Sequence, residues 1–493
     1  MKESIGRRQG LLIILLLFVV SVLLRLPNLN RPLSKHHEYN TAVILLNIES
    51  WRQAGGGDHF HYIPLLNYQN AGDKRPEDLP NIDSKGNMLY LSFAPGWYVI
   101  PYFIYQVFHL PVEPVYLQVI NLFFNLATII LLFLLCERLV PAGHPRRYQG
   151  IILTCILFMF SPGILWYLGN GYAHPGIMMP FVIGIFLLLI PMLQSADNIR
   201  PARLIPLFVL IVVLFYIDWF ALFFSAVSSV WILFKIRKDK RYVKLLFTIA
   251  IACITGIAIF VIQFASYTGI ENLISRLLFR FKGRGIAHSK APFFNHIRLI
   301  AKNIATSYLP LILLMLVSAA VLRFKKVKIS FTGSERIFMA CYALVVFLYN
   351  FILMEWSAEH EFGLIPLGLL LVIPAARLVT TFANGRFFYV IVASFFVITC
   401  FQYYYINRPG KASWDGSPFD MYKKLGEAVQ NVPPDYKIFI HDWSAVIDIY
   451  AHRNFTKVPD IDSAKAYMQR YNIPKAVWIE HRNYQLQSIV ILR

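Results

Sequence analysis

A short polar segment after the first apolar run carries the residue types best suited to chemistry. His36 and His37 precede Glu38, and a partly amphipathic stretch with helical character follows as far as Trp51. A carboxylate in this position can act as a general base on a hydroxyl group, while the histidines orient it or help to bind a metal or a phosphate. The same residues also suit a plain helix start, where Glu38 interacts favourably with the helix dipole. Both interpretations stay open at this point.

Three further turns between apolar segments hold ionisable residues. His174 ends the turn at 170–174, Asp218 precedes Trp219, and His360 and Glu361 belong to the acidic turn 355–361. Ionisable residues at a membrane boundary are candidates for substrate contacts. They also have simpler interpretations, because His174 and Asp218 can cap the following helix and the acidic turn can be an exposed connection.

The histidines raise the question of a metal. His36, His37, His174 and His360 can in principle form a divalent metal site, but no ligand spacing in the sequence supports one. The five cysteines all fall inside apolar segments and are expected to be packing residues. We therefore predict no certain cofactor, with a divalent metal as an open candidate.

Membrane helices are the elements that must position these residues. The 493 residues are 57% hydrophobic and 15% charged, and the mean hydropathy is +0.53, whereas a soluble domain is about 25% charged. Apolar runs of membrane length predict about eleven spans. They lie near 10–27, 115–138, 149–168, 175–194, 203–217, 219–236, 243–266, 305–323, 337–354, 363–380 and 386–405.

The net charge of +20 indicates topology rather than nucleic-acid binding, because Lys and Arg gather in short clusters between the apolar runs. If the proline-containing segment 89–110 lies in the outer interface instead of crossing, the main basic loops share the side of the N-terminus. We therefore expect a cytoplasmic N-terminus and an outer C-terminus. The candidate residues then lie on the outer face.

The composition changes near residue 408. Helical stretches at 418–429 and 464–471 alternate with strand-like stretches at 436–441, 476–480 and 488–492. The predicted fold is an all-α polytopic membrane protein with about eleven transmembrane helices, outer interfacial helices and a small C-terminal α/β unit. We expect a transmembrane domain over 1–407, whose first outer loop is 28–114, and a small outer α/β domain over 408–493.

The order of these features resembles the GT-C superfamily of membrane glycosyltransferases, in the group that includes protein mannosyltransferases and the aminoarabinose transferase of lipid A. The resemblance rests on the basic N-terminus, the helix end Arg25-Leu26-Pro27, the segment 36–42 and the proline-rich segment 92–98. It is good over about the first 220 residues and only architectural beyond them.

The resemblance implies roles for several residues. The superfamily carries an acidic catalytic residue in its first outer loop, which corresponds by position to Glu38. His174 stands where related sequences have a carboxylate, so this chain departs from the family pattern there. Asp218-Trp219 matches an acidic-Trp pair in the third outer turn.

The resemblance also implies a polyprenyl-phosphate sugar donor and transfer with inversion. Such a donor needs cations near its phosphate, where negative charge grows as the glycosidic bond breaks. Lys74 in the first loop and four residues of the fourth outer loop can supply them, namely Arg276, Arg280, Lys282 and Arg284. A solvated amphipathic helix attracted to anionic lipid is the alternative for the fourth loop.

Together these features predict a glycosyltransferase of the inner (plasma) membrane that acts on a glycan, lipid or protein acceptor at the outer face, in cell-envelope glycan biosynthesis. Membrane lipid is a further partner, and nucleic acid is not. One alternative is a transporter or flippase of a lipid-linked saccharide, although the sequence shows neither the paired repeats nor the broken helices common in transporters. The other is a glycan polymerase or ligase of similar topology.

Overall fold

The computed structural model describes residues 5–33, 38–77, 81–91, 93–144, 146–284, 293–383, 385–406, 420–482 and 485–493, with backbone alone at 283 and 284. The chain forms two compact units. We call one the spanning unit; it comprises Met1–Pro27, Val119–Ile259 and Phe281–Tyr405. The other, the loop unit, comprises Asn28–Gln118, Phe260–Arg280 and Ile406–Arg493.

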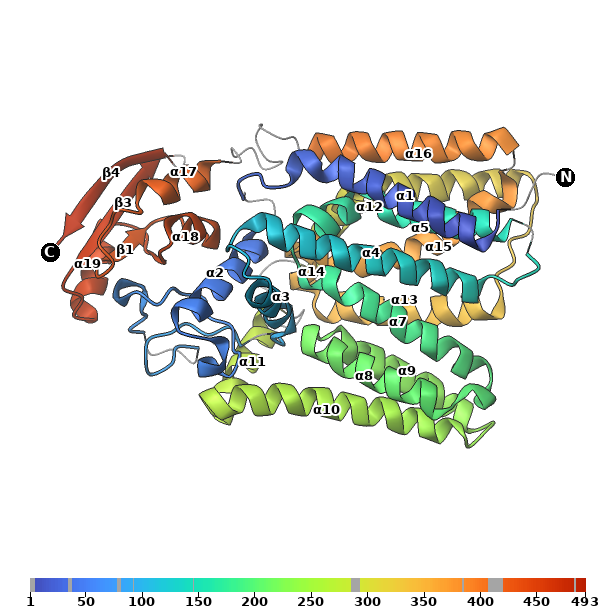
Figure 1. The fold of residues 1–493 in the computed structure, drawn as a ribbon, viewed down its shortest axis with the longest axis horizontal. Helices are drawn as coiled ribbons and strands as arrows, with labels where there is room; N and C mark the ends of the chain where they lie inside the picture. The colour runs from blue at the N-terminus through green and yellow to red at the C-terminus, as the bar shows by residue number, and fades with distance from the viewer. Residues whose placement is uncertain are drawn as a thin grey trace. The chain divides into compact units, whose positions relative to one another are not determined.

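Long apolar helices make up most of the spanning unit, and their axes lie roughly along one direction (Figure 1). Among the described residues, eight helices are long and apolar enough to cross a membrane. They are built on α1 (Arg7–Arg25), α4 (Pro114–Leu139), α7 (His174–Gln194), α10 (Tyr242–Thr268), α12 (Phe293–Phe324), α13 (Gly333–Ile352), α15 (Ile365–Phe382) and α16 (Gly385–Ile406). Large hydrophobic side chains such as Leu12, Phe123 and Ile254 remain exposed on them, as expected of lipid-facing positions. The structure confirms the polytopic all-α membrane fold.

The other three predicted spans are also helical, but they differ in form. Helices α8 (Pro201–Ile217) and α9 (Phe220–Ile236) have 17 residues each, which is near the lower limit for crossing a bilayer. Helix α15 packs against α5 (Arg147–Met159) and α12, while α7 packs against α8. All eleven predicted segments are therefore present as helices or as a helix pair.

The predicted span at 149–168 is a broken helix. The axis bends by 66° between α5 and the segment formed by α6 (Pro162–Leu165) and the π-helical turn η4 (Trp166–Asn170). Ser161 has an extended backbone, and Pro162 has no N–H with which to continue the ladder of α5. Arg25 helps to satisfy the break, since its Nε donates to the Leu165 carbonyl at 2.8 Å. The expectation that the chain has no broken helix is wrong.

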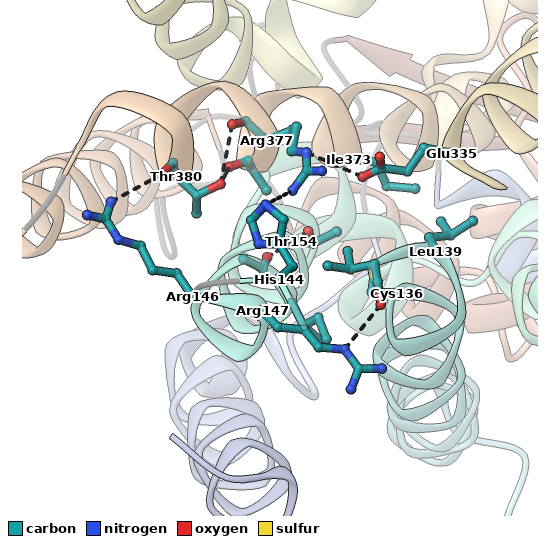
Figure 2. A pocket seen from close by; sticks show the side chains of 14 residues that line it. Cys136, Leu139, His144, Arg146, Arg147, Thr154, Glu335, Ile373, Arg377 and Thr380 are labelled. Carbon is teal, nitrogen blue, oxygen red and sulfur yellow. Dashed lines mark hydrogen bonds and ion pairs between the residues drawn. The ribbon is translucent and has the colours of Figure 1, made fainter. Parts of the chain in front are cut away.

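One end of the spanning unit gathers arginines, which tie loops to helix ends (Figure 2). Arg146 donates to the carbonyl of Ala383 at 2.7 Å. The guanidinium of Arg377 lies 2.8 Å from Nε2 of His144 and 3.6 Å from Oε1 of Glu335. These contacts involve clusters that the sequence identified as topology signals.

The loop unit also holds shorter helices, principally α2 (Tyr39–Gln53), α3 (Gly96–Val107) and most of α11 (Ile270–Arg284). Helix α3 has 12 residues and contains Pro101, and at about 1.5 Å per residue it is too short to cross a bilayer. This length agrees with the prediction that segment 89–110 does not span.

A four-stranded sheet forms the C-terminal part of the loop unit, in the order β2-β1-β3-β4. The strands are β1 (Lys437–Ile440), β2 (Phe455–Lys457), β3 (Ala476–Arg482) and β4 (Gln485–Leu492), and the helices are α17 (Met421–Ala428), α18 (Ala445–Ala451) and α19 (Ile461–Arg470). Strand β1 is parallel to β2 and β3, while β3 and β4 are antiparallel. The sequence located all of these except α18 and β2, which have seven and three residues.

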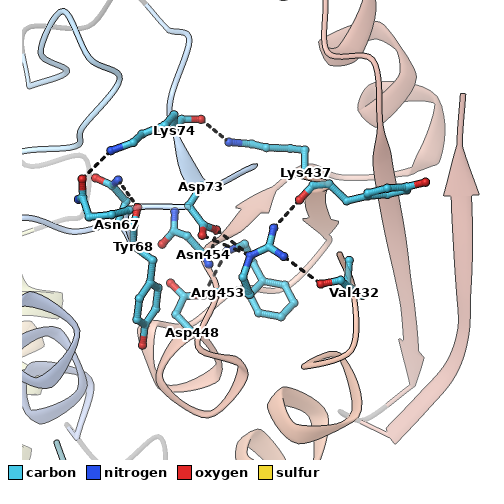
Figure 3. Close-up of polar contacts among 12 residues, drawn as sticks. Asn67, Tyr68, Asp73, Lys74, Val432, Lys437, Asp448, Arg453 and Asn454 are labelled. Atoms are coloured by element: carbon cyan, nitrogen blue, oxygen red, sulfur yellow. Dashed lines mark hydrogen bonds and ion pairs between the residues drawn. The ribbon is translucent and has the colours of Figure 1, made fainter. Parts of the chain in front are cut away.

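A buried ion pair joins the sheet to the first loop within this unit (Figure 3). Nε of Arg453 lies 3.2 Å from Oδ2 of Asp73, and the same guanidinium donates to the carbonyls of Val432 and Pro433. The backbone N–H of Asn454 donates to Asp73 at 2.7 Å. We call these contacts the Asp73 network. They show that residues from the first loop and the C-terminal segment fold together.

Candidate active site

Glu38 lies directly before α2 and is fully buried. Its side chain makes no capping hydrogen bond to α2. Its Oε1 lies instead 3.3 Å from Nη2 of Arg31, whose side chain is also buried. A neighbouring positive charge favours the ionised carboxylate, which is the form that a general base requires. The sequence did not identify Arg31, although its position in the same short loop was an available signal.

Two aromatic residues from the C-terminal segment contact residues on either side of Glu38. Tyr39 and Trp443 meet edge to face, with ring centroids 5.9 Å apart. The hydroxyl of Tyr450 accepts from the backbone N–H of Leu33 at 2.8 Å. Burial raises the pKa of Tyr450, an effect that the Leu33 N–H opposes and the nearby Glu38 reinforces. The C-terminal α/β segment therefore contributes to the environment of Glu38.

Of the other first-loop candidates, the structure describes Lys74. His36 and His37 lie outside the described residues. The Lys74 amine donates to Oε1 of Gln69 at 2.7 Å and also to Asn87. Burial lowers the pKa of Lys74, although Asp83 and Asp73 oppose the effect. The structure therefore places Lys74 in a network of loop amides.

Two arginines of α11 form a cationic feature of the loop unit. Arg276 and Arg280 lie one helical turn apart, and Nε of each is buried without a hydrogen-bond partner in the described chain. Burial, reinforced by the like charge of Arg280 and opposed by Tyr90, lowers the pKa of Arg276 to about 10. Two half-buried like charges, each with a buried Nε that no protein acceptor reaches among the described residues, are suited to an anionic ligand.

Tyr98 is affected electrostatically by Arg280 and by Tyr39, the residue after Glu38. Burial raises the pKa of Tyr98 well above its ordinary value, Tyr90 and Tyr39 add to the effect, and Arg280 opposes it. Tyr39, at the start of α2, and Arg280 of α11 are thus both among the groups that act on Tyr98. Lys282 is exposed farther along α11, and Arg284 is its last residue, whose side chain lies outside the described part.

In the spanning unit, the structure brings together His174 and Asp218. Nε2 of His174 lies 2.9 Å from Oδ2 of Asp218, and the hydroxyl of Tyr349 donates to the same oxygen at 3.3 Å. The other oxygen, Oδ1, accepts from the backbone N–H of Phe220 at 2.6 Å. Asp218 therefore stabilises the start of α9, as the simpler interpretation held, and also contacts a buried histidine.

Glu361 and His360 lie beside the same aromatic residues. Glu361 is buried and accepts hydrogen bonds from Ser307 at 2.8 Å and from Tyr167 at 3.3 Å. The His360 ring stacks on Trp356 with centroids 5.9 Å apart, and Trp356 also meets the ring of His174 at 5.6 Å. We call His174, Asp218, Tyr349, Trp356, His360 and Glu361, with the partners of Glu361, the His174 cluster.

The His174 cluster combines two carboxylates that accept hydrogen bonds, two histidines and the flat faces of aromatic rings. Half-buried His360 is a member that reaches the surface, while Asp218 and Glu361 lie inside. This set can bind a ligand that carries several hydroxyl groups. Within the described ranges, no group of three or more His, Cys, Asp or Glu side chains is arranged to hold a metal ion.

Comparison with known proteins places the fold. No protein-family model matches the chain, and a search of curated proteins finds no match. The solved structure of ArnT from Cupriavidus metallidurans bound to undecaprenyl phosphate is similar, with a TM-score of 0.64 at 9% identity over 99% of this chain and 98% of that chain. ArnT from the same organism in the apo state gives a TM-score of 0.44 at 12% identity over 97% of each chain. The first likeness confirms that the chain has the GT-C fold of the aminoarabinose transferase.

Proposed function

We propose that the chain is a membrane glycosyltransferase that transfers a sugar from a polyprenyl-phosphate donor to an acceptor hydroxyl or amine. The observation that carries the proposal is the arginine pair of α11, where Arg276 and Arg280 present buried, unused donors. Such a pair fits the phosphate of a lipid-linked donor. The solved ArnT structure of the same fold is bound to undecaprenyl phosphate, which supports a polyprenyl phosphate as that ligand.

Glu38 is the proposed base. It takes the proton from the acceptor hydroxyl as the acceptor oxygen attacks the anomeric carbon. The bond between that carbon and the phosphate oxygen breaks, and its electron pair leaves with polyprenyl phosphate. A single displacement inverts the anomeric carbon. Arg31, 3.3 Å from Glu38, keeps the carboxylate in position before transfer.

The remaining candidates have proposed binding roles. Arg276 and Arg280 stabilise the growing negative charge on the leaving phosphate, and Lys74, Lys282 and Arg284 add positive charge to the donor's surroundings. His36 and His37 have a proposed role in binding the sugar or the acceptor, and within the spanning unit the His174 cluster has a proposed role in binding substrate hydroxyl groups. The proposed location is an inner membrane, with the N-terminus cytoplasmic and the C-terminal α/β segment 408–493 on the outer side.

The test of the base compares Glu38→Gln with the parent in transfer from radiolabelled polyprenyl-phosphate sugars to membrane extract. We expect the variant to lose about 10²–10⁴-fold in rate, the usual contribution of a general base. Glu49→Gln is the matched control, because it removes a carboxylate from the same helix, α2. Equal losses in the two variants, or full activity of Glu38→Gln, would remove Glu38 from the mechanism.

The test of the phosphate site is Arg280→Gln, measured at varied donor concentration. We expect about 10²-fold lower kcat/KM for the donor, as is typical when one donor to a developing charge is removed. Arg298→Gln removes an exposed arginine of α12 and should leave the rate unchanged. The same kcat/KM for the donor in both variants would contradict the assignment of Arg280 to the phosphate site.

A transporter or flippase of a lipid-linked saccharide is the second candidate, because the α5–α6 break is a feature that transporters commonly show. Movement of a labelled lipid-linked saccharide across proteoliposome membranes, without any transfer to an acceptor, would favour it. A polymerase or ligase would instead use a diphosphate-linked chain and ignore monophosphate donors.

A further inference from the structure

A cavity of about 360 Å³ lies at the arginine-rich end of the spanning unit. It is partly open and is bordered by the end of α4, the start of α5, the end of α7 and the start of α8. Three arginines line it, namely Arg138, Arg147 and Arg203, together with Glu137, Gln194 and Asn198. A single water needs only about 10–15 Å³ of such space, so a much larger polar group fits.

Arg203 has a hydrogen-bond donor at this cavity that the described part of the chain leaves unsatisfied. Its Nη1 is buried, yet it has no hydrogen-bond partner among the described residues. A buried guanidinium nitrogen without an acceptor is costly, because the group has lost water and gained nothing in return. An anion in the cavity would supply the missing acceptor.

The acidic groups near the cavity have partners elsewhere. Glu137 accepts from Nε of Arg7 at 3.0 Å and from the hydroxyl of Tyr148 at 3.0 Å. Asp197, next to Asn198, is paired with Arg241 at 2.5 Å. Neither carboxylate bonds to Arg203, so the wall of the cavity retains an excess of positive charge.

In the neighbouring pocket, drawn in Figure 2, the arginines are bonded to protein groups. Arg146 and Arg377 line that pocket. Arg146 donates to the carbonyl of Ala383, and Arg377 contacts the side chains of His144 and Glu335. Arg147 borders both pockets and donates to the carbonyls of Val140 and Glu137. Arg203 differs from these arginines in having a buried nitrogen that no protein acceptor reaches.

We propose that the cavity at Arg138, Arg147 and Arg203 binds the phosphate of an anionic ligand, and that the membrane supplies it as an anionic phospholipid headgroup. Phosphate oxygens can satisfy Nη1 of Arg203 and draw in the exposed Arg138. Basic pockets between membrane helices are suited to such headgroups. This inference does not depend on the proposed glycosyl transfer.

The experiment uses the full chain, purified and delipidated in detergent. Native mass spectrometry measures retention of phosphatidylglycerol and of phosphatidylethanolamine, and a thermal-shift titration with inorganic phosphate tests a soluble source. We expect preferential retention of phosphatidylglycerol and at least about tenfold weaker binding by Arg203→Gln. Arg200→Gln is the matched control, because it removes the same charge one turn away, where Arg200 donates to the Asp197 carbonyl at 3.0 Å.

Arg138→Gln is the second variant, since Arg138 is exposed and its replacement leaves the packing of α4 unchanged. It should weaken binding by a smaller factor than Arg203→Gln and keeps the test decisive if Arg203→Gln does not fold. Inorganic phosphate that binds with the same dependence on these arginines, without retained lipid, would support the phosphate site with a soluble source. Equal weakening by Arg200→Gln, or no binding of lipid or phosphate by the parent, would overturn the proposal.

Discussion

The loop unit and the spanning unit hold their buried carboxylates in different ways. In the Asp73 network, Asp73 faces the guanidinium of Arg453 and a backbone N–H. In the His174 cluster, Asp218 and Glu361 are held by a histidine and by neutral hydroxyls, with the Phe220 backbone N–H also donating to Asp218. The Arg453 guanidinium also donates to two backbone carbonyls, so the Asp73 pair holds the first loop to the C-terminal segment and has a structural role. Carboxylates held by hydroxyls and a histidine can exchange those partners for the hydroxyls of a ligand.

The largest effect should come from breaking the Asp73 network. Arg453→Met leaves Asp73 buried without its cation, and the loss of one partner of a buried pair costs about 3–5 kcal/mol. We expect a lower thermal midpoint and early proteolysis in the loop unit. The double variant Asp73→Asn with Arg453→Met should recover part of the loss, because no unpaired charge remains. A double variant as unstable as the single one would show that the guanidinium acts through its carbonyl contacts.

The second prediction concerns the His174 cluster. Asp218→Asn and Glu361→Gln keep the shape of each side chain and remove its charge, so we expect unfolding to change little. Transfer activity should fall about tenfold to hundredfold, the range of a hydrogen bond to a charged group. Thermal unfolding and transfer kinetics measured on the same preparations check this. A large loss of stability with normal activity would make the cluster structural and remove the contrast.

The third prediction tests the close approach of the first loop to the sheet. A Cβ on Gly72 would run into the Tyr436 carbonyl and the Arg453 guanidinium. Gly72→Ala should therefore destabilise the loop unit by about 1–3 kcal/mol, the usual effect of overpacking. Gly143→Ala is the control, since a Cβ there meets nothing within 4 Å. Chemical denaturation in detergent measures both variants, and similar behaviour would contradict the predicted contact.

The fourth prediction is a pH dependence. Lys437 is buried, and burial lowers its pKa from 10.5 to about 7. Between these values the unfolded chain carries a proton that the folded chain does not, so the contribution of Lys437 to stability rises with pH from about 7 to 10.5. Below a pH of about 7, Lys437 is protonated in both the folded and the unfolded state, and the folded state bears the cost of desolvating its charge.

Lys437→Met removes this titration. The stability of the parent relative to the variant should rise as the pH is raised from 7 to 10, as measured by thermal midpoints in matched buffers. The exposed Lys475, which pairs with Asp435 at 2.7 Å, gives the control Lys475→Met. A parent and Lys437→Met that respond identically to pH would show that Lys437 does not titrate in this window.

The apolar helices were predictable because each depends on a local run of residues. The eleven predicted segments appear as helices or as the broken pair, and the tail's longer strands and helices also appear. The break at Pro162 was missed because the run of apolar residues continues through it, so hydropathy alone gives no sign of a bend. The short α18 and β2 have too few residues for a periodic signal.

The candidate site, like the fold, was predictable only in part. Residue type and position in the outer turns indicated Glu38, His174, Asp218 and Glu361 as candidates, since ionisable groups are rare beside apolar runs. The pairing of Asp218 with His174 joins residues that lie 44 positions apart, and that of Asp73 with Arg453 joins residues 380 positions apart. No local pattern encodes such partners.

The sequence by itself determined that this chain crosses a membrane many times, because the hydrophobic effect acts on each apolar run separately. It also indicated the GT-C fold through the order of its loops. The tertiary structure decided which charges are compensated and which are left with unused donors, as in Arg276, Arg280 and Arg203. Compensation depends on desolvation and on neighbours brought in from distant segments, so it exists only in the folded protein.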